Sequence, residues 1–382
     1  MFQFYARFMN CLPALCRSAL AILAAACLLP AFAETTAPIG FVTITVPAGV
    51  TRAICLPIHD QPAFVGAVSE VTYDASSGTT PAASGQERKA AASPIAATAS
   101  SRQKQAPSLP SRAASETAVS PPPGATTITV TGANWGSFGP FATNPHVARF
   151  RTGSSSGRSY QISSNTPNSL TFSGVDLTSL VAVNEQFEIV PIDTLSSLFG
   201  ANAATAGFAT NPQIALADKV YLRGADGWLT VYNDGQHWLQ DTGANADHFA
   251  LLPDTGFLIS RVATSDLSLV LRGSVPITNF AADLPDQKTT VLASYFPVDT
   301  TLDGLKLQDS PGWVKDKNPA VADNVYVQGA SGWLTFYHDG ASWVQLGGGA
   351  LNPPITVGTA VVVARKGTTP AIYNRPPPYS AN

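Results

Sequence analysis

The sequence ADKVYLRGADGWLTVYNDGQHWLQ, from Ala217 to Gln240, is followed by a second version of itself, ADNVYVQGASGWLTFYHDGASWVQ, from Ala322 to Gln345. The two stretches align without a gap, and more than half of their positions carry the same residue. Such internal similarity indicates two copies of one structural unit. Residues that both copies share are mainly those that the fold needs, because a catalytic apparatus is rarely needed twice.

The similarity extends beyond these stretches in both directions. Two shorter motifs flank them: IVPIDT at 189–194 matches YFPVDT at 295–300, and GFLISR at 256–261 matches AVVVAR at 360–365. The period of the repeat is therefore about 105 residues. We predict a first β repeat at 191–295 and a second β repeat at 296–367.

Each copy is predicted to contain a β-hairpin. The Asp-Gly dipeptide at 234–235 suits a two-residue type I′ turn, which needs positive φ at both central residues, so Gly235 is the predicted turn glycine. In that register Val231 faces Trp238 across the ladder, while Trp228 and Tyr232 lie on the opposite face. The corresponding residues of the second copy are Gly340, Phe336, Trp343, Trp333 and Tyr337.

The rest of the chain also favours strands. Alternating runs such as FVTITV at 41–46 and TTITVTG at 126–132 are typical of half-buried strands, and no long amphipathic helix follows residue 33. We expect an all-β fold of several small antiparallel sheet or barrel-like domains. The strands of 34–74 and 125–190 are predicted to form one N-terminal β domain.

Two segments are predicted to be disordered. Residues 75–124 consist mainly of Ala, Ser, Pro, Thr and Gly, and they offer too few large apolar side chains to offset the entropy of ordering. We therefore interpret them as a flexible insertion in the N-terminal domain. The end of the chain at 368–382, which contains three successive prolines, is predicted to be a disordered tail.

The amino end has the pattern of a signal peptide, predicted at 1–33. Arg7 and Arg17 supply positive charge, and the apolar run at 19–29 is too short to span a bilayer. Ala-Phe-Ala at 31–33 provides small residues for cleavage, which would place the mature start at Glu34. The chain is therefore predicted to be exported, to a periplasmic, outer-surface or extracellular location.

Composition narrows the function classes further. Charged residues make up 12% of the chain and the net charge is −3, so no basic face is available to neutralise nucleic-acid phosphates. No apolar run after residue 33 approaches the roughly 20 residues of a transmembrane helix. Cys55 is the single cysteine outside the predicted leader, and we interpret it as a small buried hydrophobe rather than a reactive thiol.

No catalytic residue, metal site or cofactor is predicted. The GSSSG motif at 153–157 matches the pattern of a nucleophile elbow around Ser155, but that pattern requires a following helix, and 158–163 continues as a strand. A Gly/Ser run is also typical of an exposed turn. The histidines, none of which has a close ligand spacing to another, are His59, His146, His237, His248 and His338.

The repeated aromatic residues are the candidate ligand-binding group. They recur at matched positions, as Trp228, Tyr232 and Trp238 in the first copy and as Trp333, Tyr337 and Trp343 in the second. Flat rings on a sheet can stack on sugars, but rings in a sheet also pack against one another. We favour packing, and keep a glycan platform as the alternative.

Several stretches carry a resemblance to a known family. The opening GFVTITVPAG at 40–49, the run PAFVGAVSEVT at 62–72, the turn-bearing RFRTGSSSGRSYQISSN at 149–165 and the paired W-x-x-x-Y-x-D-G hairpins are similar to a family of exported β-rich proteins from verrucomicrobia. The resemblance covers nearly all of the chain after the leader except the 75–124 insertion. It implies export and a β-rich architecture, and it implies no activity.

These observations favour an exported, non-catalytic, β-rich protein with a structural or adhesive role in the envelope or outside the cell. A carbohydrate-binding protein that uses the repeated aromatics is the alternative. A secreted hydrolase is the third option, but it needs a pair of carboxylates or a Ser–His pair, and the sequence nominates neither. The expected partner is an envelope component or a glycan, and not nucleic acid.

Overall fold

A computed structural model of the chain describes residues 38–75, 124–136, 138–139, 141, 143–224, 227–329 and 332–379. The fold is all-β, as the sequence predicts: strands account for 43% and helices for 6% of the structure, and the strands form several small antiparallel sheets. The predicted signal peptide at 1–33 and nearly all of the predicted 75–124 insertion lie outside the described residues.

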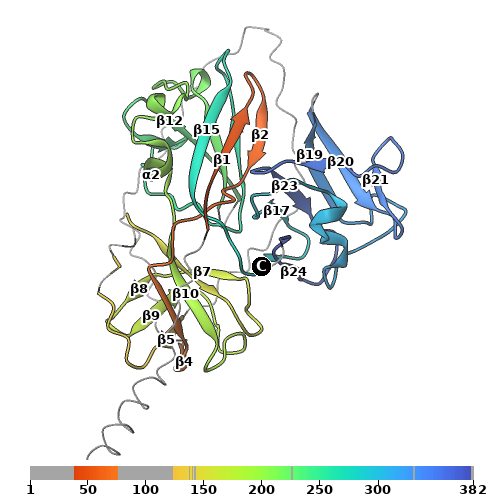
Figure 1. The fold of residues 1–382 in the computed structure, drawn as a ribbon. Coiled ribbons are helices and arrows are strands. Elements are labelled where there is room, and N and C mark those ends of the chain that lie inside the picture. The colour runs from red at the N-terminus through yellow and green to blue at the C-terminus, as the bar shows by residue number, and fades with distance from the viewer. Residues whose placement is uncertain are drawn as a thin grey trace, which may run out of the picture. The chain divides into compact units, whose positions relative to one another are not determined.

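The strands between residues 64 and 191 form two four-stranded sheets, which we call the middle unit (Figure 1). One sheet has the order β3-β10-β6-β7 and the other β4-β5-β9-β8. Buried residues from both sheets, such as Phe150, Phe187, Ile128 and Phe172, belong to one hydrophobic cluster. The strands are β3 (Phe64–Ala67), β4 (Glu70–Asp74), β5 (Ala125–Thr129), β6 (His146–Phe150), β7 (Ser159–Gln161), β8 (Ser164–Asn165), β9 (Ser169–Ser173) and β10 (Gln186–Pro191).

The segment predicted as the first repeat contributes to a five-stranded sheet in the order β13-β12-β11-β14-β2, next to a two-stranded ribbon of β1 and β15. Apolar side chains of the ribbon, such as Ile44 and Leu269, pack in one cluster with Val231 and Trp238 of the sheet. The strands are β1 (Ile39–Val46), β2 (Thr51–Ile54), β11 (Lys219–Gly224), β12 (Gly227–Asn233), β13 (Trp238–Gln240), β14 (Phe257–Ser260) and β15 (Leu267–Ser274). The short helices are α2 (Leu195–Phe199), η1 (Ala203–Ala206) and η2 (Ile214–Leu216).

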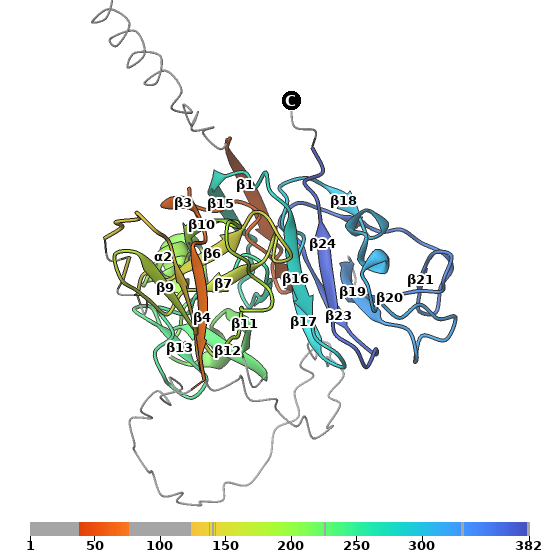
Figure 2. The same ribbon diagram turned by 90° about the horizontal axis from the view of Figure 1, so that it is seen from below.

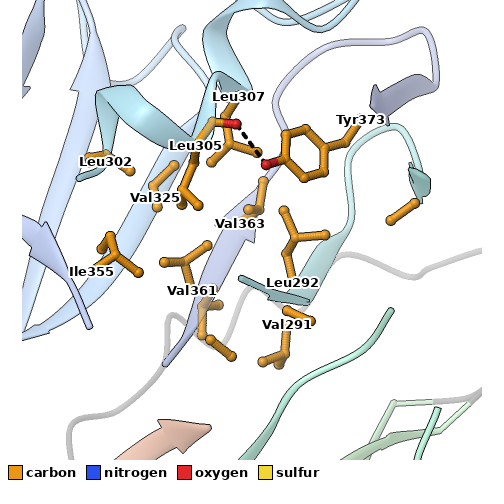
Figure 3. Close-up of a cluster of buried hydrophobic side chains, with 14 of the residues drawn as sticks. Val291, Leu292, Leu302, Leu305, Leu307, Val325, Ile355, Val361, Val363 and Tyr373 are labelled. Carbon is orange, nitrogen blue, oxygen red and sulfur yellow. Dashed lines mark hydrogen bonds between the residues drawn. The ribbon is translucent and has the colours of Figure 1, made fainter. Parts of the chain in front are cut away.

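The segment predicted as the second repeat contributes to another five-stranded sheet, in the order β21-β20-β19-β23-β17. Its core includes valines and leucines such as Val291, Leu305, Val325 and Val361, and it also includes Tyr373 (Figure 3). The strands are β16 (Phe280–Leu284), β17 (Thr289–Ala293), β18 (Thr300–Thr301), β19 (Asn324–Gly329), β20 (Gly332–His338), β21 (Trp343–Gln345), β22 (Pro354–Ile355), β23 (Ala360–Ala364) and β24 (Ala371–Arg375). The short helices are η3 (Asp303–Leu305) and η4 (Leu307–Asp309).

The two five-stranded sheets agree in register. Arg223 pairs with Trp228 in the first, and the matching residues Gln328 and Trp333 pair in the second. The edge strands also correspond, because β2 pairs with β14 in the first sheet as β17 pairs with β23 in the second. The two-stranded ribbons match in the same way: β1 with β15 in the first case, and β16 with β24 in the second (Figure 2). Each five-stranded sheet with its ribbon is called a scaffold half below.

This pairing departs from the grouping that the sequence suggests. The sequence predicts that residues 39–54 join the strands of 125–190, but β1 pairs with β15 and β2 pairs with β14. The second scaffold half likewise begins with β16 and β17, which precede the predicted boundary at 296. The cause is long-range pairing, which local alternation of apolar residues does not reveal. The middle unit therefore interrupts the first scaffold half between β2 and α2.

The two halves exchange matching contacts. Ile54, at the end of β2, forms a bridge with Thr359 of the second half, and Leu292, at the same position of β17, forms a bridge with Thr255 of the first half. The amide of Cys55 donates to the carbonyl of Gly358 at 2.9 Å. The two sheets are therefore joined by backbone hydrogen bonds as well as by apolar packing.

Part of the segment predicted to be a disordered tail is ordered. Residues 371–375 form β24, in which Tyr373 is 1% and Arg375 is 5% exposed. The Tyr373 hydroxyl donates to the carbonyl of Leu305 at 2.6 Å (Figure 3), and Arg375 Nη1 donates to the carbonyl of Ser294 at 3.0 Å. The prolines that follow the strand suggested a tail, but Ala371 and Tyr373 alternate into the core of the second half.

Candidate functional site

The predicted hairpin turns have a different geometry from the one expected. Trp238 pairs with Asn233 rather than with Val231, so the connection spans four residues, 234–237. Asp234 Oδ1 accepts the backbone N–H groups of Gln236 and His237, both at 2.8 Å. Within residues 234–237 only Gly235 has positive φ, at 106°. Gly340, at the matching position of the second hairpin, has a φ of 105°. The aspartate side chain thus stabilises a longer loop, and a type I′ turn, with positive φ at both central residues, is not formed.

Trp238 and Trp343 lie in the interior of the two scaffold halves. Their side chains are 0% and 3% exposed. Trp238 Nε1 donates to the carbonyl of Gly200 at 3.0 Å, and its ring lies edge-on to Phe208 with centroids 5.3 Å apart. The Trp343 ring lies 6.1 Å from that of Trp313. Rings enclosed in this way pack the core and leave no face open for stacking on a sugar.

The other four repeated aromatics lie on the opposite face of their sheets and are half-buried. Trp228 and Trp333 both pack against the hydrophobic cluster of the second half. Tyr232 and Tyr337 share that face, because each lies an even number of residues from the tryptophan of its strand. The structure therefore divides the six candidates between two faces, and it does not bring them together as one site.

A buried ion pair recurs in both halves, and the sequence reading missed it. Asp218 pairs with Arg261 in the first half and Asp323 pairs with Arg365 in the second, with all four side chains 0% exposed. Arg365 also donates to the carbonyl of Gly312 at 2.7 Å. The signal was present, since these aspartates and arginines are identical in both copies. A buried charge is tolerated only when it is paired, so these residues belong to the fold.

A third buried polar cluster connects the middle unit to the second half. Arg149 forms an ion pair with Glu188, and its Nη1 donates to the hydroxyl of Tyr295 at 2.6 Å. The His59 ring lies 5.2 Å from that of Tyr295, and burial, with the nearby Arg149 charge, lowers the pKa of His59 to about 3. Burial also raises the pKa of Tyr295. This cluster is enclosed, so its contacts hold the two parts together.

Cys55 and Ser155 occupy structural positions. Cys55 is 0% exposed, its Sγ lies 3.5 Å from the hydroxyl of Ser294, and burial raises the pKa of its thiol. Ser155 is also 0% exposed, and its hydroxyl donates to the carbonyl of Leu180 at 2.9 Å. The GSSSG motif forms the turn between β6 and β7, and no helix follows it. Neither side chain has the exposure or the base that a nucleophile needs.

Ligands for a metal ion do not converge in the part of the chain that the structure describes. No group of three or more His, Cys, Asp or Glu side chains there lies close enough to hold one. Among the same residues, no helix has the length and apolar character to cross a membrane.

A cleft of about 370 Å³ lies between the middle unit and the first scaffold half. Its middle-unit wall includes Phe141 and Gln161, and its other wall includes Arg223, His248 and Phe249. The remaining lining residues are Pro145, Leu222, Ala250, Leu251, Leu252, Thr255, Gly256 and Phe257. Sequence reasoning could not find this cleft, because its two walls are more than fifty residues apart along the chain.

Local strand pairing explains where the cleft forms. The β11–β14 ladder ends at the pair Tyr221–Leu258, so Leu222 and Arg223 extend beyond it. Gly256, which precedes β14, instead donates its N–H to the carbonyl of Val291 in the second half at 2.9 Å. The end of β11 therefore has no strand beside it on this side, and the middle unit closes the gap only in part.

No known family model, curated protein or solved structure matches this chain. The resemblance to exported proteins of verrucomicrobia therefore stays a prediction from the residues. The function has to be argued from the fold and from the cleft.

Proposed function

We propose that this chain is an exported, non-catalytic protein with a structural or adhesive role in the cell envelope or outside the cell. The observation that supports this most is the use of its interior charges. Asp218, Arg261, Asp323 and Arg365 are wholly enclosed and bind one another or backbone groups. Charged groups that are enclosed and paired in this way stabilise a fold and do not face a surface where a substrate could bind.

The arrangement of the chain suits a scaffold. Two β halves of matching register, which we take to be two copies of one unit, exchange edge contacts at Ile54 and Leu292. The first half carries the middle unit as an insertion between β2 and α2. A rigid support that presents an inserted unit is a common way to display a binding surface, because the support fixes the position of the surface.

Export is the part of this proposal that the amino end supports. Expression of the whole chain in a bacterial host, followed by fractionation, should place the protein outside the cytoplasm, with a new amino terminus at Glu34. A chain that stays in the cytoplasm with residues 1–33 attached would contradict export. Pull-down from an envelope fraction by the purified mature chain should recover a defined partner, and a clean negative result would contradict the adhesive role.

Carbohydrate binding is the second candidate function. The cleft is a better candidate for the glycan-binding site than the repeated tryptophans are. Trp238 and Trp343 are enclosed, whereas the cleft combines aromatic, amide and cationic side chains on an accessible surface. Such a mixture of apolar walls and a few polar groups is typical of small-ligand sites between structural units. A glycan-array screen of the mature chain tests this candidate, and an array with no bound glycan would contradict it.

A further inference from the structure

The cleft between the middle unit and the first scaffold half contains a cation, the guanidinium of Arg223. Arg223 is half-buried at the end of β11, and its guanidinium makes no hydrogen bond or ion pair with any residue that the structure describes. A partly desolvated guanidinium with no acceptor is unfavourable, because it has lost water and gained nothing in return. His248, which is exposed, lines the same cleft.

Comparison of the two halves shows that the fold does not require this cation. The register position of Arg223 is occupied in the second half by Gln328, whose amide donates to the carbonyl of Gly329 at 3.3 Å. The loop at 346–355, which corresponds to the loop of His248, contains no histidine. Among the described residues, Arg223 and His248 thus occur together only in the half that adjoins the middle unit and its cleft.

The other lining groups narrow the class of ligand. No acidic side chain is among the described residues that line the cleft. Phe141 and Phe249 offer apolar ring surface, on which the C–H face of a sugar can pack, and the exposed Gln161 offers an amide for hydroxyl groups. A volume of about 370 Å³ lies within the usual range for small-molecule sites.

We propose that this cleft binds an acidic saccharide, with the carboxylate of a uronic acid on the Arg223 guanidinium. The planar guanidinium can donate two parallel N–H groups to a carboxylate, and the ring of His248, which lines the same cleft, offers a further donor. The proposal deepens the carbohydrate-binding candidate given above, and it rests on the proposed envelope role only for its biological setting. The chemistry of recognition depends only on the cleft.

Isothermal titration calorimetry on the purified mature chain, residues 34–382, tests this site. The probes are D-glucuronate, D-galacturonate and trigalacturonate, with D-glucose and D-galactose as neutral counterparts. Arg223→Gln introduces the residue that the second half carries at this position. Arg272→Gln is the matched control, because Arg272 is an exposed arginine of β15 outside the cleft.

Uronates should bind, and their neutral counterparts should bind at least tenfold more weakly. Arg223→Gln should weaken uronate binding about 10–100-fold, which is the range for a lost hydrogen-bonded charge pair. Arg272→Gln should bind like the unsubstituted protein, and both variants should melt at an unchanged temperature. Added salt should weaken uronate binding.

The proposal would be overturned if no uronate gave heat at millimolar concentration, or if uronates and neutral sugars bound with equal affinity. It would also be overturned if the Arg223→Gln variant bound uronates as tightly as the unsubstituted protein. A fourth contrary result would be tighter binding of a triglutamate peptide than of trigalacturonate. The last result would assign the cleft to an acidic peptide. Failure in calorimetry leaves the export and envelope experiments unaffected, and a cytoplasmic protein that still binds uronates would contradict only the proposed location. The two proposals can therefore fail separately.

Discussion

Asp323→Asn should sharply destabilise the second scaffold half. The substitution keeps the size of the side chain and removes its charge. It leaves the guanidinium of Arg365, which is 0% exposed, without a counter-charge. The change therefore isolates the electrostatic contribution of the pair from its packing.

The contacts of Asp323 set the magnitude of the loss. Its Oδ2 accepts from Arg365 Nε at 2.9 Å and from the amide of Val314 at 2.8 Å, and its Oδ1 accepts from the amide of Lys366 at 2.6 Å. An asparagine can present one acceptor oxygen, so at least one of these donors faces an NH₂ group and is left unpaired. Breaking a buried pair by removing one charge costs about 3–5 kcal/mol in unfolding free energy.

Guanidinium unfolding followed by tryptophan fluorescence measures this loss. Trp313 is a local reporter, because the Arg365 guanidinium lies 5.9 Å from its ring centroid. The matched variant Asp218→Asn should cause a loss of the same order in the first half, where Arg261 is equally enclosed.

A double variant separates an unpaired charge from a general defect. Asp323→Asn combined with Arg365→Met removes both charges and should recover at least half of the stability, since buried pairs can often be replaced by apolar residues. A single variant that loses less than about 1 kcal/mol would refute the reasoning. So would a double variant that is no more stable than the single one.

Trp238→Phe should lower the free energy of unfolding by about 1–3 kcal/mol more than Trp343→Phe does. The reason is that Trp238 Nε1 has a carbonyl acceptor at 3.0 Å, while Trp343 Nε1 has none among the described residues. Equal losses in chemical denaturation would contradict this. Gly340→Ala should lower the free energy of unfolding by about 1–2 kcal/mol, because alanine is strained at a φ of 105°. Gly349→Ala is the control, since its φ is not positive and the space around it is equally open. It should cause no measurable loss in the same assay. Burial lowers the pKa of His59 from 6.5 to about 3. Between these two pH values the unfolded state binds more protons than the folded state, so the free energy of unfolding falls as the pH drops from 6.5 toward 3. His59→Gln should flatten this dependence in thermal melts between pH 7 and 4, and parallel curves for the two proteins would count against it.

The candidate site could be predicted from the sequence only in part. The recurrence of Trp238 and Trp343 indicated residues that the fold needs, and both lie in the core. Arg223 gave no signal of its own, because a single arginine in a strand is usually a solvated residue. Its meaning depends on Gln161 and Phe141, which reach the same cleft from another unit. No local pattern encodes such convergence.

The hairpin register shows a similar limit at short range. The Asp-Gly dipeptide predicted a turn at the right place and the need for Gly235 at positive φ. It did not predict that the Asp234 carboxylate would accept two backbone amides and lengthen the loop. A side chain that competes for backbone donors changes the turn type, and dipeptide preferences average over such cases.

The sequence by itself determined the all-β class and the matching strand patterns of the two stretches, because alternation of apolar residues and turn glycines act locally. Only the tertiary structure decided which strands share a sheet. β1 and β2 join β15 and β14, more than two hundred residues away, and β24 forms from a segment with the composition of a tail. An edge strand pairs with whatever partner buries its apolar face and satisfies its backbone groups, and that choice depends on contacts distant in the chain. The enclosed ion pairs and the cleft at Arg223 follow from the same distant contacts.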